Sequence, residues 1–86
     1  MDIEQALNRV RACLQQVCPE VDFAEVSDYT ELLPERVITS FQVIDLILHL
    51  EHERGRPIER RDLEPGCFRN ITTIAKRFFL EVSEHE

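Results

Sequence analysis

Apolar residues recur every three or four positions along the first segment of the chain, which is the spacing of one face of an α-helix. The segment runs from about Asp2 to Cys18. Asp2 is a suitable N-terminal cap, and Pro19 cannot continue a helix. The predicted buried face consists of Ile3, Ala6, Leu7, Val10, Cys13, Leu14 and Val17. The pattern therefore predicts a first helix that packs on the rest of the protein along this face.

The segment from Pro19 to Thr39 contains apolar residues without a steady period. A connection of this length is uncommon in a compact domain, and such loops are usually packed or functional. We expect this one to cross the helices as a loop held by its apolar side chains. These anchors are Val21, Phe23, Val26, Tyr29, Leu32, Leu33 and Val37.

A second helix is predicted from Thr39 and Ser40 to Arg54. Thr39 and Gln42 have the spacing of a capping box, in which each side chain accepts a hydrogen bond from the backbone amide of the other residue. Ser40 is then the first helical residue. Gly55 suits the left-handed conformation after a helix, and a proline follows shortly after it.

The second helix carries more apolar residues than one buried face needs. They are Phe41, Val43, Ile44, Leu46, Ile47, Leu48 and Leu50. A polar stripe runs beside them, formed by Gln42, Asp45, His49 and His52. Ile44 and Leu48 flank this stripe next to Asp45, so we expect both to face solvent. Exposed apolar side chains beside charged ones are typical of a docking surface.

Two further elements are predicted in the last third of the chain. A short helical turn is expected from Arg61 to Glu64, because Pro65 and Gly66 follow it. A last helix is expected to begin at Asn70, with Lys76 and Arg77 on its outer side. Its inner face would contain Ile71, Ile74, Ala75, Phe78 and Val82. The expected architecture is one all-α domain spanning residues 1–86.

Size and charge restrict the function. A chain of 86 residues builds one modest core and leaves little volume for a deep catalytic pocket. The net charge of −7 excludes nucleic acid and an anionic membrane as the main partner, and favours a partner with a basic docking surface. Residues 1–35 hold eight acids and two bases, whereas residues 36–80 hold six acids and eight bases. Among the bases, Arg54, Arg56, Arg60 and Arg61 form a cluster that we interpret as solvated.

The cysteines indicate a reducing environment. Cys13, Cys18 and Cys67 are odd in number, and no leader segment or membrane-spanning apolar run accompanies them. Cys13 and Cys18 are five positions apart, which does not match a metal-binding pair. We therefore predict buried core thiols in a monomeric cytoplasmic protein.

Ser40 is the first candidate for chemistry. No histidine close in sequence could act as its base, which disfavours a serine hydrolase. A helix N-terminus does provide a favourable position for a phosphate. His49 and His52 have the spacing of two metal ligands, but a third ligand with suitable spacing is missing, so we predict solvated histidines. Asp45, Glu51 and Glu53 are predicted on an exposed helix, where perturbed catalytic acids are not expected.

The second helix and its flanks resemble a known family. The run from Thr39 to Glu51, preceded by Leu32-Leu33 and Val37-Ile38, is similar to the segment around the prosthetic-group serine of acyl carrier proteins. The resemblance extends over about residues 30–80. Its further parts are Gly55 to Ile58, Asp62-Leu63 and Phe68 to Ile74.

This resemblance implies a four-helix bundle with a short third helix and a long loop between helices 1 and 2. It also implies that Ser40 is the attachment point for 4′-phosphopantetheine from coenzyme A. The chain would then be a stand-alone acyl or aminoacyl carrier, not an enzyme, that holds its cargo as a thioester in fatty acid or secondary metabolite biosynthesis. Its partners would be a phosphopantetheinyl transferase and acyl or aminoacyl ligases, synthases or transferases. The implied partner-binding residues are Phe41, Ile44, Asp45, Leu48 and Glu51.

One position departs from the family pattern beside the serine. Thr39 stands where the family has an aspartate, so the cap is kept and the negative charge is lost. His52 likewise stands where an acid is usual. These departures leave an alternative open, in which the chain is a degenerate carrier-like domain that is never modified and acts as a protein-interaction module.

Overall fold

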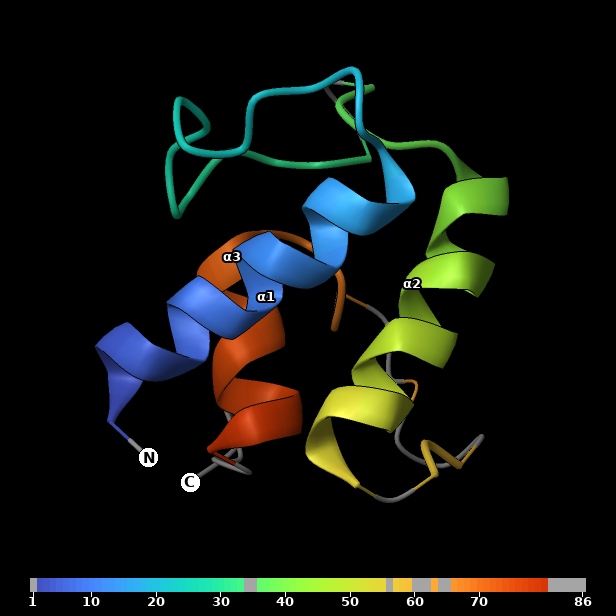
Figure 1. The fold of residues 1–86 in the computed structure, drawn as a ribbon. Coiled ribbons are helices and arrows are strands. Elements are labelled where there is room, and N and C mark those ends of the chain that lie inside the picture. Colours follow the sequence, from blue (N-terminus) through green and yellow to red (C-terminus); the bar gives the residue numbers. More distant parts are fainter. Residues whose placement is uncertain (1, 34–35, 56, 60–62, 64–65, 81–86) are drawn as a thin grey trace.

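A computed structural model describes residues 2–33, 36–55, 57–59, 63 and 66–80. These residues form α1 (Ile3–Val17), α2 (Ser40–Arg54) and α3 (Ile71–Ile74), and α3 continues directly into the π-helical turn η2 (Ala75–Phe79). They contain no strand, so the expected all-α class is confirmed for this part of the chain. Figure 1 shows α1 crossing in front of the α3–η2 segment, with α2 beside them and the long loop across one end. The predicted turn from Arg61 to Glu64 and residue Val82 fall mostly outside the described residues.

The helix ends follow the capping signals in the sequence. The Gln5 amide donates to Asp2 Oδ1 over 2.8 Å, and the Gln5 side chain accepts from the Asp2 amide, so α1 begins with a complete capping box. α2 ends at Arg54 because Gly55 takes the left-handed conformation, with φ at 76°. At α3, the Thr73 amide donates to Asn70 Oδ1 over 2.7 Å. Local hydrogen bonds therefore determine where the helices start and stop.

The predicted inner face of α1 is buried or, at Leu7 and Val17, half-buried, apart from its first residue. Ala6, Val10, Cys13 and Leu14 are covered, and Ile3 remains 40% exposed. Ile3 lies in the first turn, at the free end of the helix, so the prediction that it is buried is wrong. The core that α1 helps to form also contains Cys18, Phe23, Leu32, Ile38, Leu46, Leu50, Cys67, Phe68, Ile71, Ile74, Ala75 and Phe78.

The π-helical turn was not expected from the sequence. The Leu80 amide donates to the Ala75 carbonyl five residues earlier, over 3.1 Å, which defines the wider turn. Phe78 still points into the core, where its ring stacks on Phe68 with 5.4 Å between the ring centroids. Lys76 and Arg77, which were predicted on the outer side of this helix, are half-buried.

The loop crosses the helices as expected, but only some of its apolar residues anchor it. Phe23 and Leu32 are buried, whereas Leu33 is 38% exposed and Tyr29 is 72% exposed. The prediction for Tyr29 and Leu33 is therefore wrong. Beside Tyr29, the loop is attached through its backbone: the amide and hydroxyl of Thr72 both donate to the Asp28 carbonyl, over 3.1 and 3.2 Å.

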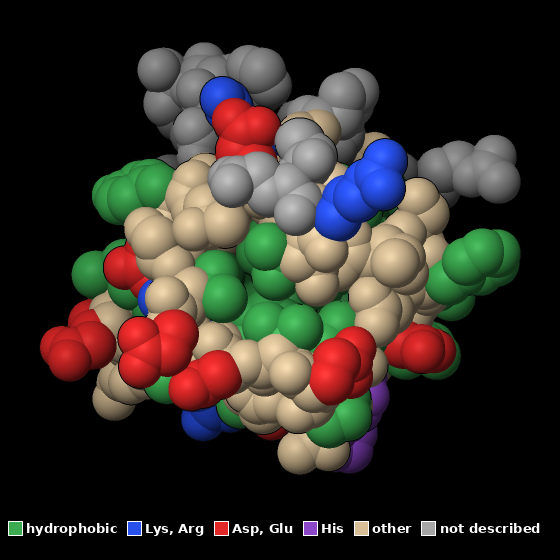
Figure 2. All heavy atoms as spheres, turned by 90° about the horizontal axis from the view of Figure 1, so that it is seen from above, with side chains coloured by type: hydrophobic (Ala, Val, Ile, Leu, Met, Phe, Trp, Pro, Cys, Tyr) green, Lys and Arg blue, Asp and Glu red, His purple; other side chains and the backbone are tan. Residues whose placement is uncertain are grey.

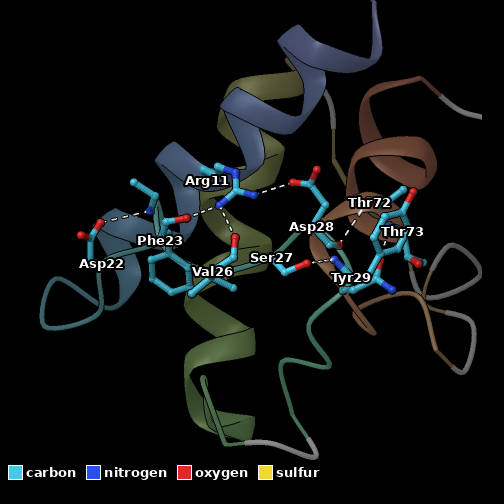
Figure 3. Close-up of polar contacts among 11 residues, drawn as sticks. Arg11, Asp22, Phe23, Val26, Ser27, Asp28, Tyr29, Thr72 and Thr73 are labelled. Atoms are coloured by element: carbon cyan, nitrogen blue, oxygen red, sulfur yellow. Dashed lines mark hydrogen bonds and ion pairs between the residues drawn. The ribbon is translucent and has the colours of Figure 1, made fainter.

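Two polar side chains of α1 hold the loop from the other side, and Figure 3 shows the contacts of the first, Arg11. Arg11 donates to the carbonyls of Phe23 and Val26 and to the carboxylate of Asp28. One turn further on, Gln15 Nε2 donates to the Val21 carbonyl over 2.7 Å, and Gln15 Oε1 accepts from the Phe23 amide. The described part of the loop forms no helix or strand, so these side chains supply hydrogen-bond partners to backbone groups that packing removes from water.

Candidate functional site

The start of α2 is the candidate site, and Thr39 and Gln42 shape it. The Gln42 amide donates to Thr39 Oγ1 over 3.3 Å, and the Thr39 amide donates to the Gln42 side chain over 2.8 Å. The predicted capping box is therefore confirmed, and Ser40 is the first residue of the helix. Thr39 thus caps the helix with a neutral side chain, so no negative charge stands directly before Ser40.

Ser40 is exposed, and its side chain makes no hydrogen bond to the described residues. The backbone amides of Ser40 and Phe41 likewise have no partner among those residues. Free amides at a helix N-terminus, together with the positive end of the helix dipole, favour an anionic group. The hydroxyl of Ser40 is thus accessible to another molecule, and its surroundings favour a phosphate ester on it.

Contacts behind the helix hold this site in place. The amides of Val37 and Ile38 both donate to the Leu32 carbonyl, over 2.9 and 3.2 Å, and Ile38 is buried directly before the cap. The Gln42 side chain also lies near the thiol of Cys18, at the end of α1. Figure 1 shows the first turn of α2 at the same end of the molecule as the end of α1. The first turn of α2 therefore rests on both α1 and the loop.

An exposed apolar stripe follows Ser40 along α2. Phe41 is 84% exposed, and Ile44 and Leu48 are each 60% exposed. Positions 41, 44 and 48 fall on one side of a helix, with Asp45 between them, exposed as well. The expected solvent-facing positions of Ile44 and Leu48 are confirmed. Only Leu46 and Leu50 of α2 are fully buried, which explains the surplus of apolar residues seen in the sequence.

Glu51 lies at the edge of this stripe and also forms a hydrogen bond within the protein. Its Oε2 accepts a hydrogen bond from the Ile58 amide over 2.7 Å, and the side chain is half-buried. This contact fastens the chain that follows α2 back onto the helix. The prediction of Glu51 as a partner-binding residue is untested, but part of its hydrogen-bonding capacity is used inside the protein.

Among the described residues, neither histidine is placed as a base for Ser40. His49 lies nine positions along the same helix, about 13 Å from Ser40 along its axis, which is too far for a serine–histidine pair. His49 and His52 are both exposed, as expected. No group of three or more metal-ligating side chains occurs among the described residues.

The three cysteines are buried, as predicted, and the pKa of two of the thiols is raised. Burial, with a smaller effect from the nearby negative charge of Glu53, raises the pKa of the Cys13 thiol to about 11. Burial and the charge of Glu20 raise the pKa of the Cys18 thiol. Both thiols therefore stay protonated at neutral pH, and a protonated thiol is a poor nucleophile and metal ligand.

Some structural roles near the site had no signal in the sequence. The local pattern around Arg11 and Gln15 does not reveal this role, because most of their partners lie 6 to 17 positions away along the chain. Arg54 corrects another expectation, since it is half-buried and its guanidinium lies 5.7 Å from the centre of the Phe78 ring. The prediction that the arginine cluster is solvated is therefore wrong for Arg54. Its other members, Arg56, Arg60 and Arg61, lie outside the described residues.

The described helices are also too short or too polar to cross a lipid bilayer. Comparison of the chain with protein-family models, with curated proteins and with solved structures finds no match.

Proposed function

We propose that this chain is a stand-alone carrier that holds an acyl or aminoacyl group on 4′-phosphopantetheine attached to Ser40. The observation that supports it best is the exposed hydroxyl at the first position of α2, followed by the exposed stripe of Phe41, Ile44 and Leu48. We further propose that residues between α2 and α3 add a short helix, which would complete a four-helix bundle.

The residues around Ser40 fit the group. In the attachment step, the Ser40 oxygen bonds to the phosphorus of coenzyme A nearest the pantetheine, the pyrophosphate bond breaks, adenosine 3′,5′-bisphosphate leaves, and the serine proton passes to a base of the transferase. The free amides of Ser40 and Phe41 would face the phosphate, and the helix dipole would favour its charge. Thr39 and Gln42 hold this turn without using the Ser40 hydroxyl. When attached, the group supplies a thiol that carries the cargo as a thioester.

The exposed stripe would be the surface that partner enzymes read. Apolar side chains at helical spacing insert into a groove of a partner, and Asp45 beside them would select a partner with a complementary positive charge. The transferase must reach Ser40, and the loading and consuming enzymes must reach the cargo. A single surface next to Ser40 would serve all of them in turn.

Modification of Ser40 is directly measurable by intact mass. After incubation with coenzyme A, magnesium and a broad-specificity phosphopantetheinyl transferase, we expect a gain of one phosphopantetheine group. Ser40→Ala should abolish this gain. Ser27→Ala is the matched control, because Ser27 is an exposed serine in the loop and its loss should leave the gain unchanged.

A mass gain that survives Ser40→Ala would contradict the assignment of the site. No gain with any transferase, and none in protein isolated from its own cells, would instead support the alternative of an unmodified interaction module. Thr39 in place of aspartate is the observation that favours this alternative, since the charge beside the serine is missing.

The exposed stripe leads to a second prediction, about the rate at which Ser40 is modified. Leu48→Glu should leave the far-ultraviolet circular dichroism unchanged, because Leu48 is exposed, and should slow transfer of phosphopantetheine to Ser40 by about tenfold, the loss of about 1.4 kcal/mol. His49→Glu is the control, an exposed neighbour outside the stripe. Equal rates of phosphopantetheine transfer to both variants would show that the transferase does not bind the stripe. Loss of the helical signal in Leu48→Glu would show that Leu48 is packed in the core.

A further inference from the structure

An open groove of about 410 Å³ runs between the N-terminal half of α1 and the loop that Arg11 holds. It lies away from Ser40, because Figure 1 places the start of α1 at the opposite edge of the molecule from the start of α2. The lining residues are Glu4, Leu7, Asn8, Arg11, Ala24 and Asp28.

The groove is acidic even though Arg11 lines it. The Arg11 guanidinium already donates to two carbonyls and to Oδ1 of Asp28, so its donors are directed into the protein. In Figure 3 the second carboxylate oxygen of Asp28 points away from Arg11. Glu4 is exposed and forms no ion pair with any described residue. Two carboxylates thus remain able to accept from a cation.

The surroundings strengthen this negative charge. Arg9 and Arg11 are the two bases in the first 35 residues. Both are engaged, Arg9 with Glu53 over 3.5 Å and Arg11 with Asp28. The exposed loop acids Glu20, Asp22 and Glu25 form no ion pairs within the described part. Figure 2 shows most acidic side chains of the loop face in the lower half of the view, around apolar side chains at its centre.

The remaining lining suits a long basic side chain. Leu7 is half-buried and Ala24 is exposed, so together they add apolar surface to a groove that also contains the two carboxylates. Lysine and arginine lay their aliphatic stems on such a surface while their charge stays at its polar edge. We propose that this groove is a docking site for a basic segment of a partner protein, which inserts a lysine or arginine side chain between Glu4 and Asp28.

This docking site is independent of the modification of Ser40. A partner held in the groove would leave the start of α2 accessible, so the protein could bind one partner here while another acts at Ser40. Complementary charges at an exposed site mainly raise the association rate and select the partner. Binding should therefore weaken with added salt.

The test is a titration of the isotope-labelled full chain, followed by amide shifts in nuclear magnetic resonance spectra. The probe is a short acetylated and amidated peptide of alternating lysine and leucine, and the same peptide with glutamate in place of lysine is its control. We expect saturable shifts at Leu7, Asn8 and Ala24 with the basic peptide alone. Glu4→Gln should raise its dissociation constant about two- to fivefold. Glu20→Gln, the same loss of charge outside the groove, should change it less.

Several outcomes would overturn the proposal. The first is the absence of any saturable shift, and the second is a set of shifts along Phe41 to Leu48 in place of the groove. The third is an equal effect of Glu4→Gln and Glu20→Gln, which would mean unspecific attraction. Equal binding of spermidine at the same residues would assign the groove to a small cation, and shifts that grow with protein concentration alone would assign it to a second copy. Since the unmodified protein is used, none of these results depends on whether Ser40 is a carrier site.

Discussion

Leu46→Ala should lower the free energy of unfolding by about 2 to 5 kcal/mol, whereas Leu48→Ala should change it by less than about 0.5 kcal/mol. The two leucines lie on the same helix, two positions apart, yet Leu46 is 0% exposed and Leu48 is 60% exposed. Truncating Leu46 removes packed methyl groups and leaves a cavity in the core. Truncating Leu48 removes groups that already face water.

Urea unfolding followed by circular dichroism at the helical band measures both changes. A domain of this size has little stability to lose, so Leu46→Met provides a milder version of the same test, with an expected cost under about 1.5 kcal/mol. If Leu48→Ala were as costly as Leu46→Ala, α2 would be rotated from its observed orientation, and the proposed partner-binding stripe would be part of the core.

Arg11→Ala should lower the free energy of unfolding by about 2 to 4 kcal/mol. The variant takes the donors away from the carbonyls of Phe23 and Val26 and leaves the Asp28 carboxylate without its cation. The cost falls on the whole fold, because Asp28 also ties the loop to α3 through Thr72.

Arg9→Ala is the matched control for this prediction. Arg9 also lies on α1 and forms an ion pair, with Glu53 over 3.5 Å, but both side chains are largely exposed. Such pairs contribute at most about 1 kcal/mol. Arg11→Lys should not restore the stability, since one ammonium group does not reproduce the fork of a guanidinium on three acceptors. Equal unfolding midpoints for Arg9→Ala and Arg11→Ala would contradict the role assigned to Arg11.

Most of the helical framework could be predicted from short sequence signals. Asp2, Thr39 and Asn70 mark helix starts, and Gly55 marks an end, because the bonds that define a helix end join residues a few positions apart. The position of Ser40 follows from the same rule. The exposure of Ile44 and Leu48 could also be predicted, since a helix with too many apolar residues for one face must expose some of them.

The loop and the π-helical turn show where such reasoning ends. Tyr29 looked like an anchor by its ring, but the loop is attached there through the carbonyl of Asp28, and hydrophobicity gives no information about backbone hydrogen bonds. The turn η2 carries Phe78, which packs on Phe68 and lies near Arg54 in the core, and nothing in its local spacing predicts the wider winding.

The sequence by itself determined the all-α class, the ends of the helices and a serine at the first position of α2, because these depend on interactions between near neighbours. Tertiary structure alone decided which side chains hold the loop, that Glu51 accepts a hydrogen bond from the Ile58 amide, and that Glu4 and Asp28 line one groove. Each of these depends on residues brought together from distant positions. Their partners are selected by the geometry of the assembled helices, and the local pattern around any one of them does not contain that geometry.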